Sequence, residues 1–358
     1  MQGSIAAGPP QKGALSYCSN TDSLHTQVLL LPCAAAFSAA PLLPPPASRH
    51  AAVLHQTPTL RRCAVPAALR MVAAANKSPL PAPEKLKTSQ LAQLASMTVL
   101  SIDTGDLDIV EQFAATGYIT DATTNPLFVS QAGLSGDPRY VEFVEEAITY
   151  AKEKMCNMDG CDVDDAIALA MDRLAVNLGK TILAKGIKGY VSTEVDPRLS
   201  FDTDESLVRA RRIIQMYEDE GVPRSRVLIK LAATWEGIAA AEVLEKEGIT
   251  CNLTLVFGTL QAKTCAQRGV RLISPFPGRI LDWHKADSKF DSCEPEKDPG
   301  VVACKEMYGY FKKFGHETIC MPGTLRLLCR VCRVAIAGGL VCPYSARPLL
   351  ASFAFGLA

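Results

Sequence analysis

The chain has 358 residues, 48% of them hydrophobic, and its 37 basic and 37 acidic residues give no net charge. This length and apolar content allow one large globular domain or two ordinary ones, and the balanced charge argues against an electrostatic binder of nucleic acid or membranes. No apolar stretch reaches the length that spans a bilayer. The 13 cysteines are scattered and lack the paired spacing of a zinc site, so we expect mostly free thiols in a reducing compartment.

Residues 1–75 differ in composition from the rest of the chain. Asp22 is the only acidic residue before Glu84, whereas arginine and lysine recur and alanine, proline and serine dominate. An acid-poor, Ser- and Ala-rich N-terminus with arginines is typical of an organelle transit peptide, and the proline content favours a plastid. Processing is expected between Arg62 and Ala75. A disordered linker or a misplaced start codon would explain the same composition, and the cytoplasm is the alternative location.

Residues 76–324 alternate short apolar runs with longer amphipathic segments. Alternation of strands and helices predicts a parallel α/β sheet, and seven strands over about 230 residues are one fewer than in an eight-stranded barrel. The predicted strands are Val99–Asp103, Gly117–Thr123, Tyr190–Val195, Val227–Ala232, Cys251–Val256, Leu272–Pro275 and Thr318–Met321.

The predicted helices follow from apolar residues spaced three and four apart, and most of them stop at a glycine. In the longest, Ile167, Met171, Leu174 and Leu178 form one stripe. The predicted helices are Leu107–Ala115, Asp164–Ala184, Asp204–Glu220, Trp235–Glu247 and Gly258–Arg268.

Residues 325–358 form a third part, because no acidic residue occurs in them. So abrupt a change in a mixed-charge protein suggests an altered reading frame, a retained intron or an alternative exon. The other interpretation is a divergent last unit, with Leu325–Val334 as a helix and Val334–Val341 as an eighth strand. The residues leave both interpretations open.

Lys230 is the most informative residue, since it interrupts the apolar run Val227–Ala233. Parallel strands covered on both faces are near-continuous apolar runs, so a lysine there is out of place. Burial of an ammonium without a partner is costly and is usually relieved by a lowered pKa, and a neutral lysine amine forms Schiff bases with carbonyl substrates. The alternative is a strand-end lysine whose charged head reaches solvent.

Strand parity places further polar residues late in several strands. Side chains alternate along a strand, so Asn252 and Thr254 share one face, while Leu253 and Leu255 are expected on the other. Barrel enzymes build their active sites at this C-terminal end of the strands. Pairs of polar residues on one face occur in two other predicted strands: Ser101 with Asp103, and Ser192 with Glu194.

Three polar residues, Asp103, Asn125 and Arg279, each have both a structural and a functional interpretation. Asp106 is better placed than Asp103 to cap the following helix, which leaves Asp103 for chemistry. Asn125 precedes a proline, so a turn is as plausible as a site role. Arg279 follows a Pro- and Gly-rich loop, where it could be a surface residue or could hold a phosphate bidentately.

Seven short motifs, in this order and spacing, are similar to those of one enzyme family. They are Asp103–Asp106, Asp121–Pro126, Ser192–Asp196, Leu228–Ala232, Cys251–Leu255, Ile273–Phe276 and Gly278–Trp283. The chain resembles the transaldolases, in their longer branch, from about Ser96 to Met321. The resemblance implies a (β/α)8 TIM barrel of the class I aldolase type, without metal or organic cofactor.

The resemblance also implies an activity. Transaldolases transfer a dihydroxyacetone unit between sugar phosphates in the non-oxidative pentose phosphate pathway. The donor would be sedoheptulose 7-phosphate or fructose 6-phosphate, and the acceptor glyceraldehyde 3-phosphate or erythrose 4-phosphate. The partners expected are therefore sugar phosphates, with no nucleic acid and no membrane. The resemblance does not decide between a monomer and a homodimer.

By the same resemblance, each matching position acquires a role. Lys230 would form the Schiff base, and Asp103 would remove and return the proton of the C4 hydroxyl. Glu194 and Thr254 would hold a water that shuttles protons. The residues that would hold the substrate are Asn125, Asn252 and Ser274 for its hydroxyls, and Arg279 and Arg326 for its phosphate.

The sequence departs from the family after Met321, where the family pattern is Met-Gly-Ala-Ser-Phe-Arg-Asn and this chain continues Pro322-Gly323-Thr324-Leu325-Arg326. The family's eighth strand and closing C-terminal helices are missing or replaced. A barrel without its last strand would expose the edges of its first and seventh strands. We therefore expect a poorly stable chain with weak or no activity. The alternatives are a non-catalytic isoform, a gene-model artefact with an open barrel, or a Schiff-base aldolase that releases free dihydroxyacetone.

Overall fold

The computed structural model describes Lys87, residues 89–155 and 162–287, Glu294, residues 296–323 and, for the backbone alone, residues 340–343. The predicted leader, 1–75, and most of the predicted tail, 325–358, lie outside the described residues, so those two boundaries stay predictions. All described residues belong to one unit, Arg62–Ala358.

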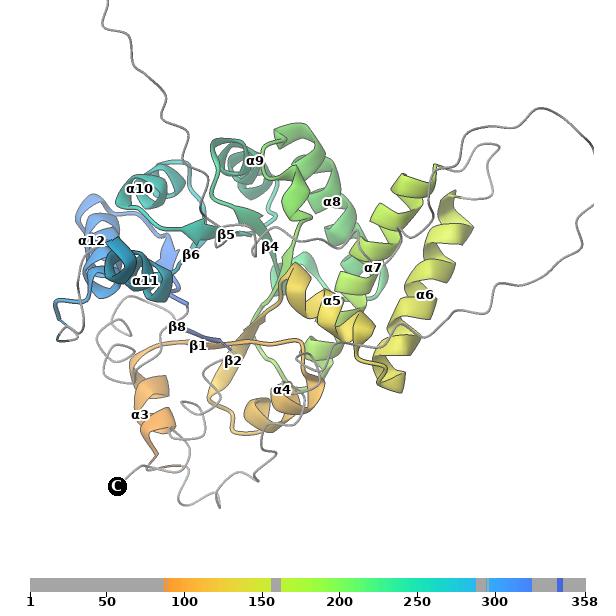
Figure 1. Ribbon diagram of the computed structural model, residues 1–358, viewed down its shortest axis with the longest axis horizontal. Coiled ribbons are helices and arrows are strands. Elements are labelled where there is room, and N and C mark those ends of the chain that lie inside the picture. The colour runs from red at the N-terminus through yellow and green to blue at the C-terminus, as the bar shows by residue number, and fades with distance from the viewer. Residues whose placement is uncertain are drawn as a thin grey trace, which may run out of the picture. The chain divides into compact units, whose positions relative to one another are not determined.

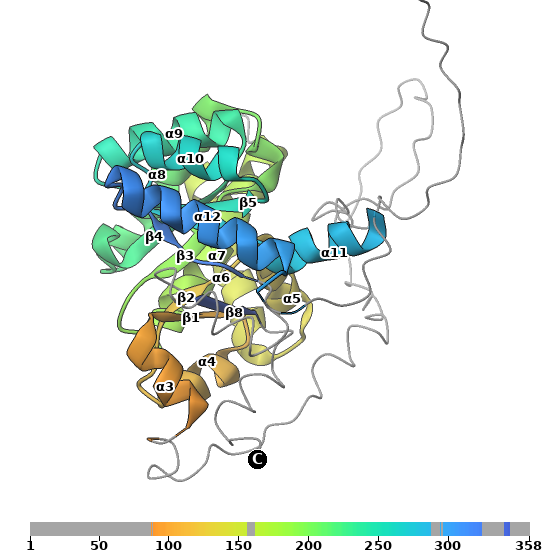
Figure 2. The same ribbon diagram turned by 90° about the vertical axis from the view of Figure 1, so that its left-hand side faces the viewer.

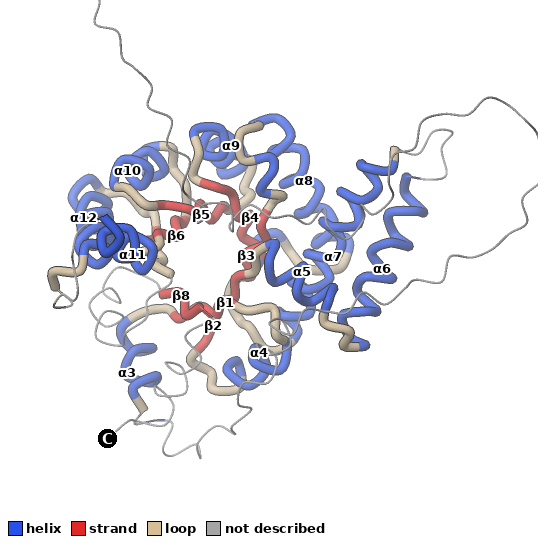
Figure 3. Tube along the Cα trace, viewed as in Figure 1, coloured by secondary structure: helices blue, strands red, loops and turns tan. Residues whose placement is uncertain are grey.

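One parallel sheet organises the described residues. Its strand order is β7-β6-β5-β4-β3-β2-β1-β8, so strands adjacent in sequence are adjacent in space from β1 to β7. The strands curve around a common centre and the helices lie outside them (Figures 1 and 3). The strands are β1 Leu100–Asp103, β2 Ile119–Thr123, β3 Val191–Glu194, β4 Val227–Ala232, β5 Cys251–Val256, β6 Leu272–Pro275, β7 Ile319–Cys320 and β8 Leu340–Pro343.

The parallel α/β fold predicted from the alternating pattern is confirmed, and the strands form an incomplete (β/α)8 barrel of the kind that the resemblance implied. Three predicted strands, β4, β5 and β6, have the predicted bounds, and the other four are shorter than predicted. Every residue of these three strands except Leu255 is buried, as expected where both faces of a strand are covered.

The helices cover the outer face of the sheet, as the two views in Figures 1 and 2 show. The five predicted helices are present to within about one residue at each end. No helix among the described residues is long and apolar enough to cross a membrane. The helices are α3 Gln90–Met97, α4 Leu107–Ala114, α5 Pro126–Leu134, α6 Pro138–Met155, α7 Val163–Ala184, α8 Thr203–Asp219, α9 Trp235–Lys246, α10 Thr259–Gln267, α11 Pro277–Asp287 and α12 Pro299–Phe314, with short 3₁₀ turns at Pro197–Leu199 and Arg224–Arg226.

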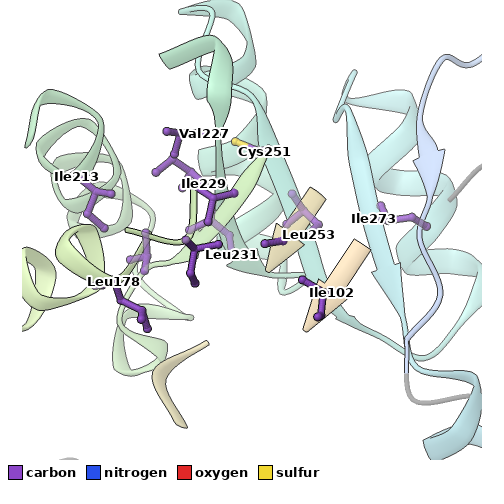
Figure 4. Close-up of a cluster of buried hydrophobic side chains, with 14 of the residues drawn as sticks. Ile102, Leu178, Ile213, Val227, Ile229, Leu231, Cys251, Leu253 and Ile273 are labelled. Atoms are coloured by element: carbon purple, nitrogen blue, oxygen red, sulfur yellow. The ribbon is translucent and has the colours of Figure 1, made fainter. Parts of the chain in front are cut away.

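The outward face of the sheet supplies the main hydrophobic core. Ile229 and Leu231 of β4 and Leu253 of β5 pack there with Leu178 of α7 and Ile213 of α8 (Figure 4). The alternate positions of the same strands face inward, where a second, small cluster holds Leu228, Leu272 and Met321. Lys230 lies on the same strand face as Leu228, two residues nearer the C-terminal end of the strand.

Strand β8 pairs in parallel with β1, from Leu100 opposite Leu340 to Asp103 opposite Pro343. The expectation that the edge of the first strand is exposed is therefore wrong, because Leu340–Pro343 satisfies its hydrogen bonds. The predicted eighth strand, Val334–Val341, overlaps β8 at Leu340 and Val341 only, and the predicted helix Leu325–Val334 lies outside the described residues. Within the described part of the chain, no pairing joins β7 to β8, so the ring of strands is not closed there.

Candidate active site

Lys230 lies in the middle of β4, surrounded on both sides by neighbouring strands. The residue is 7% exposed, and its Nζ lies 3.0 Å from Oε2 of Glu194 on β3 and 3.3 Å from the carbonyl oxygen of Thr124, which follows β2. Glu194 and Lys230 are register partners in the β3–β4 ladder. The buried amine of Lys230 therefore has two partners: it forms an ion pair with Glu194 and donates to the carbonyl oxygen of Thr124.

Asp103, the last residue of β1, lines the same cavity as Lys230. Its Oδ1 is buried and has no hydrogen-bond partner among the described residues. Burial raises the pKa of this carboxyl from 3.8 to about 6, the charge of Lys230 opposes the rise, and the charge of Glu194 adds to it. A carboxyl with this pKa exchanges its proton near neutral pH, as a general acid and base must.

The neighbouring cap explains why Asp103 is available. Asp106 accepts hydrogen bonds from the backbone N–H groups of Asp108 and Ile109 at 3.1 and 3.2 Å, so it caps α4 as predicted. The helix start is thus satisfied without Asp103. The carboxylate of Asp103 stays in the cavity.

Three polar side chains form a chain of hydrogen bonds beside the amine. Asn252 Nδ2 donates to Ser192 Oγ at 3.1 Å, and Ser274 Oγ donates to Asn252 Oδ1 at 2.6 Å. The three residues lie on β3, β5 and β6, and each is buried. Thr254, two residues after Asn252, lines the cavity with Lys230 and Ser274. The parity argument is therefore confirmed for Ser192, Asn252 and Thr254.

Asn125 has the structural role that its position before a proline allowed. It is the N-cap of α5, and its Oδ1 accepts from the backbone N–H of Phe128 at 3.1 Å. This contact fixes the side chain by its oxygen. It lies one residue after Thr124, whose carbonyl oxygen accepts from Lys230.

The structure describes only one of the two arginines that were predicted to bind phosphate. Arg279 was predicted to lie in a loop, but it is the third residue of α11, because the helix begins at Pro277. It is exposed, and the helix follows directly after β6 and its cavity residues. Arg326 lies outside the described residues.

The cavity includes residues for which no role was predicted. Thr123, Phe276 and Gly323 line it with Asp103, Lys230 and Thr254. Thr123 is the register partner of Asp103, so strand parity applied to β2 could have found it. The carbonyl oxygen of Thr124 has no signal in the sequence, because every residue carries one. No group of three or more His, Cys, Asp or Glu side chains in the described part of the chain could hold a metal ion.

The family described as Transaldolase/Fructose-6-phosphate aldolase matches residues 100–339 of the chain. The chain belongs to this family. The match includes every strand that carries a cavity residue, and it extends beyond Met321, where the motif resemblance ended. Family membership makes the protein an enzyme of the transferase class.

Curated relatives are similar over the same region. The chain is 47% identical to a transaldolase of Histophilus somni (strain 2336) over 239 residues, which cover 67% of this chain and 72% of the relative. It is 46% identical to a transaldolase of Alteromonas mediterranea over 240 residues, covering 67% and 71%. It is 48% identical to a transaldolase of Glaesserella parasuis serovar 5 over 238 residues, covering 66% and 72%.

Proposed function

We propose that this transaldolase-family protein transfers a dihydroxyacetone unit from a ketose phosphate to an aldose phosphate through a Schiff base on Lys230. The observation that carries the proposal is the position of Lys230, whose amine lies buried in one cavity with Asp103 and 3.0 Å from Glu194. The Glu194 carboxylate is placed to take up a proton from the amine as the amine adds to a carbonyl carbon. The neutral amine is the nucleophile that carbonyl chemistry requires.

The reaction begins when the amine of Lys230 adds to the ketone carbon of the donor. The carbinolamine that results loses water, and Glu194 and Thr254 hold the water that moves protons in this step. The iminium nitrogen then accepts the electron pair of the C3–C4 bond as that bond breaks. Asp103 takes the proton of the C4 hydroxyl, so the first aldose phosphate leaves and an enamine remains.

The second half of the reaction reverses these steps on a new aldehyde. The enamine carbon attacks the aldehyde of the acceptor, and Asp103 returns its proton to the oxygen that becomes the new hydroxyl. Water then releases the new ketose phosphate from Lys230. Asn125, Asn252 and Ser274 hold the hydroxyls of the three-carbon fragment, which keeps the enamine bound between the two halves.

Phosphate binding is assigned to Arg279 and Arg326. A guanidinium can hold a phosphate with two parallel hydrogen bonds, and the first turn of a helix adds backbone N–H groups and a favourable dipole. The exposed Arg279 in the first turn of α11 fits this requirement. Anchoring the remote phosphate aligns the carbons that react.

The substrates follow from the proposed reaction, whereas the proposed location follows from the composition of the N-terminal residues. The donors are sedoheptulose 7-phosphate and fructose 6-phosphate, and the acceptors are glyceraldehyde 3-phosphate and erythrose 4-phosphate, which places the enzyme in the non-oxidative pentose phosphate pathway. The acid-poor composition of residues 1–75 supports a plastid location. Fluorescence of a fusion to residues 1–75, compared with a fusion to residues 76–358, would test that location.

Borohydride trapping tests the central step. Sodium borohydride reduces a Schiff base to a stable secondary amine, so the full chain treated with fructose 6-phosphate and borohydride should carry one adduct at Lys230. Lys180→Met is the matched control, because Lys180 also pairs with a glutamate, Glu220, at 2.8 Å but outside the cavity. The adduct should persist in this variant. Labelling at another lysine, or no label on a folded sample, would contradict the proposal.

A second reaction needs its own test because the family description includes fructose-6-phosphate aldolase. Such an enzyme would use the same Schiff base but release free dihydroxyacetone. The two reactions differ in their need for an acceptor: transfer stops after one turnover when no aldehyde is present, whereas release continues. Free dihydroxyacetone that accumulates over many turnovers without acceptor would favour the aldolase.

A further inference from the structure

Strand β5 contains a local irregularity beside the site. Leu255 has a φ of 59°, and it is the only non-glycine residue with positive φ in the described part of the chain. The left-handed region is unfavourable for a side chain with a Cβ, so another interaction must maintain it. Leu255 directly follows Thr254, which lines the cavity.

The irregularity reverses the parity of the strand. Cys251, Leu253 and Val256 all pack in the main core on the outward face, whereas a regular strand would place Val256 inward with Thr254. Leu255, expected in the core with Leu253, is instead 44% exposed. The register of β5 against β6 shifts between Leu253 and Val256, as in a β-bulge. Thr254 is thereby the last inward-facing residue of β5.

The bulge leaves one backbone carbonyl outside the ladder. The carbonyl oxygen of Thr254 accepts from the N–H of Ala233, and that of Val256 accepts from the N–H of Phe276. The carbonyl oxygen of Leu255 accepts instead from Nε2 of Gln261, in the first turn of α10, at 3.1 Å. This contact holds the Leu255 carbonyl in the orientation that the left-handed conformation gives it, so it favours the bulge.

Gln261 joins this carbonyl to three other backbone groups. Its Nε2 also donates to the carbonyl oxygen of Ala233, just after β4, at 3.0 Å. Its Oε1 accepts from the N–H groups of Phe257 and Gly258, at 3.0 and 3.2 Å. The two Oε1 contacts belong to the N-terminal cap of α10, but the two Nε2 contacts do not, because they connect the ends of β4 and β5.

We propose that Gln261 is a positioning residue, which holds Leu255 in its left-handed conformation and so keeps Thr254 in the cavity beside Lys230. The inference rests on the proposed function of Lys230 and Thr254. It adds a residue that touches no substrate but fixes the hydroxyl that takes part in proton transfer. Loss of its two donors allows Leu255 to return to an extended conformation, and Thr254 then turns away from the cavity.

Two substitutions in the full chain separate this role from helix capping. Gln261→Glu keeps both acceptor contacts to the helix cap and places a carboxylate against the carbonyl oxygens of Ala233 and Leu255. Gln261→Leu removes all four contacts. Both variants should lower kcat about tenfold, with KM changed less than about twofold, because the loss concerns proton transfer and not binding. Gln267→Leu, in the last turn of the same helix, is the matched control with wild-type kcat, since its amide donates to Tyr310.

A rescue experiment supplies the decisive readout. Glycine adopts positive φ without strain, so Leu255→Gly in the Gln261→Glu background should restore most of kcat, and alone it should leave kcat unchanged. If the role of Gln261 is purely structural, its substitution should lower the fraction of folded protein but not kcat per folded molecule. In that case Leu255→Gly should not restore the lost activity. Either of these results would overturn the inference.

Crystal structures of the variants distinguish failure of this inference from failure of the proposed function. Leu255 should have negative φ in Gln261→Glu and Thr254 should point out of the cavity, whatever reaction the site performs. If Leu255 keeps its positive φ in the variant, Gln261 does not hold it, and the inference is wrong. Absence of a borohydride adduct at Lys230 in the wild type would instead refute the proposed function and the link from Thr254 to catalysis.

Discussion

Replacing Asp103 by asparagine should stabilise the protein and inactivate it. The pKa of Asp103 is raised from 3.8 to about 6 because the folded protein buries its carboxyl. The folded state therefore binds the proton more tightly than the unfolded state does. The contribution of protonated Asp103 to the free energy of unfolding is therefore fully present below about pH 4 and is lost as the pH rises through 6.

The magnitude follows from the shift. One pKa unit corresponds to about 1.4 kcal/mol, so a rise of about two units makes the charged Asp103 cost roughly 2 to 3 kcal/mol at pH 7 and above. An asparagine at this position has nearly the same shape and never ionises. The free energy of unfolding of Asp103→Asn minus that of the wild type should therefore increase by about that amount between pH 4 and pH 8.

Urea unfolding at one-unit intervals from pH 4 to pH 8 measures this difference. Asp106→Asn is the control, because Asp106 lies three residues away and an asparagine can also accept the two N–H groups of the α4 cap. Turnover of Asp103→Asn should fall by roughly 10² to 10⁴, as expected when a general acid and base is lost. A stability difference that stays constant with pH, or wild-type protein that is the more stable at pH 8, would refute the reasoning.

The remaining predictions concern the other groups. Glu194→Gln, which removes the charge 3.0 Å from the Lys230 amine, should slow adduct formation with fructose 6-phosphate by about 10² or more, measured by mass spectrometry after borohydride quenching; adduct formation at the wild-type rate would exclude Glu194 from the proton transfer. Arg279→Ala should raise KM for fructose 6-phosphate about tenfold or more and leave kcat nearly unchanged, whereas Arg271→Ala, at the opposite end of β6, should do neither; equal effects of the two would argue against phosphate binding at α11. Replacing residues 324–358 by the corresponding segment of the Histophilus somni relative should raise Tm and kcat by closing the ring between β7 and β8, and a full chain that already unfolds cooperatively with full turnover would show that closure is unnecessary.

The predictable part of the fold is the part whose residues are buried on both sides. Strands β4, β5 and β6 have the predicted bounds, and the helices between them end near their glycines. Helices α6 and α12 were missed for different reasons. Helix α6 buries only Tyr140, Ala147 and Ala151, so its apolar stripe is narrow, and seven of its 18 residues are charged. Helix α12 has buried residues at a recognisable spacing, including Cys304, Met307 and Phe311, and could have been predicted from them.

Strand parity predicted which strand faces carry the polar residues of the cavity, but it did not predict the contacts between them. Parity gives the face of a strand on which Lys230 or Glu194 lies, but only the ladder register makes these two residues neighbours. Register depends on how whole strands pair, so a local pattern cannot supply it. For the same reason the bulge at Leu255 was missed: the alternation of Asn252, Leu253, Thr254 and Leu255 is regular in sequence, and the shift arises from contacts with Gln261 and β6.

The pairing of the strands also brings the charged side chains of the cavity together. Two carboxyls, Asp103 and Glu194, face one amine, Lys230, and the amine lies directly against Glu194. Asp103 has no hydrogen-bond partner of its own among the described residues, and burial raises its pKa. In the proposed reaction, the protonated Schiff base on Lys230 places a positive charge in the same cavity as Asp103. That charge favours the ionised form of Asp103 and so its action as a base in the step that breaks the C3–C4 bond. The same cation disappears when the enamine forms, and Asp103 is then disposed to give its proton to the acceptor. If the proposed mechanism holds, the Schiff base controls the protonation of Asp103 in each half of the reaction, and this control requires the two groups to lie in one cavity.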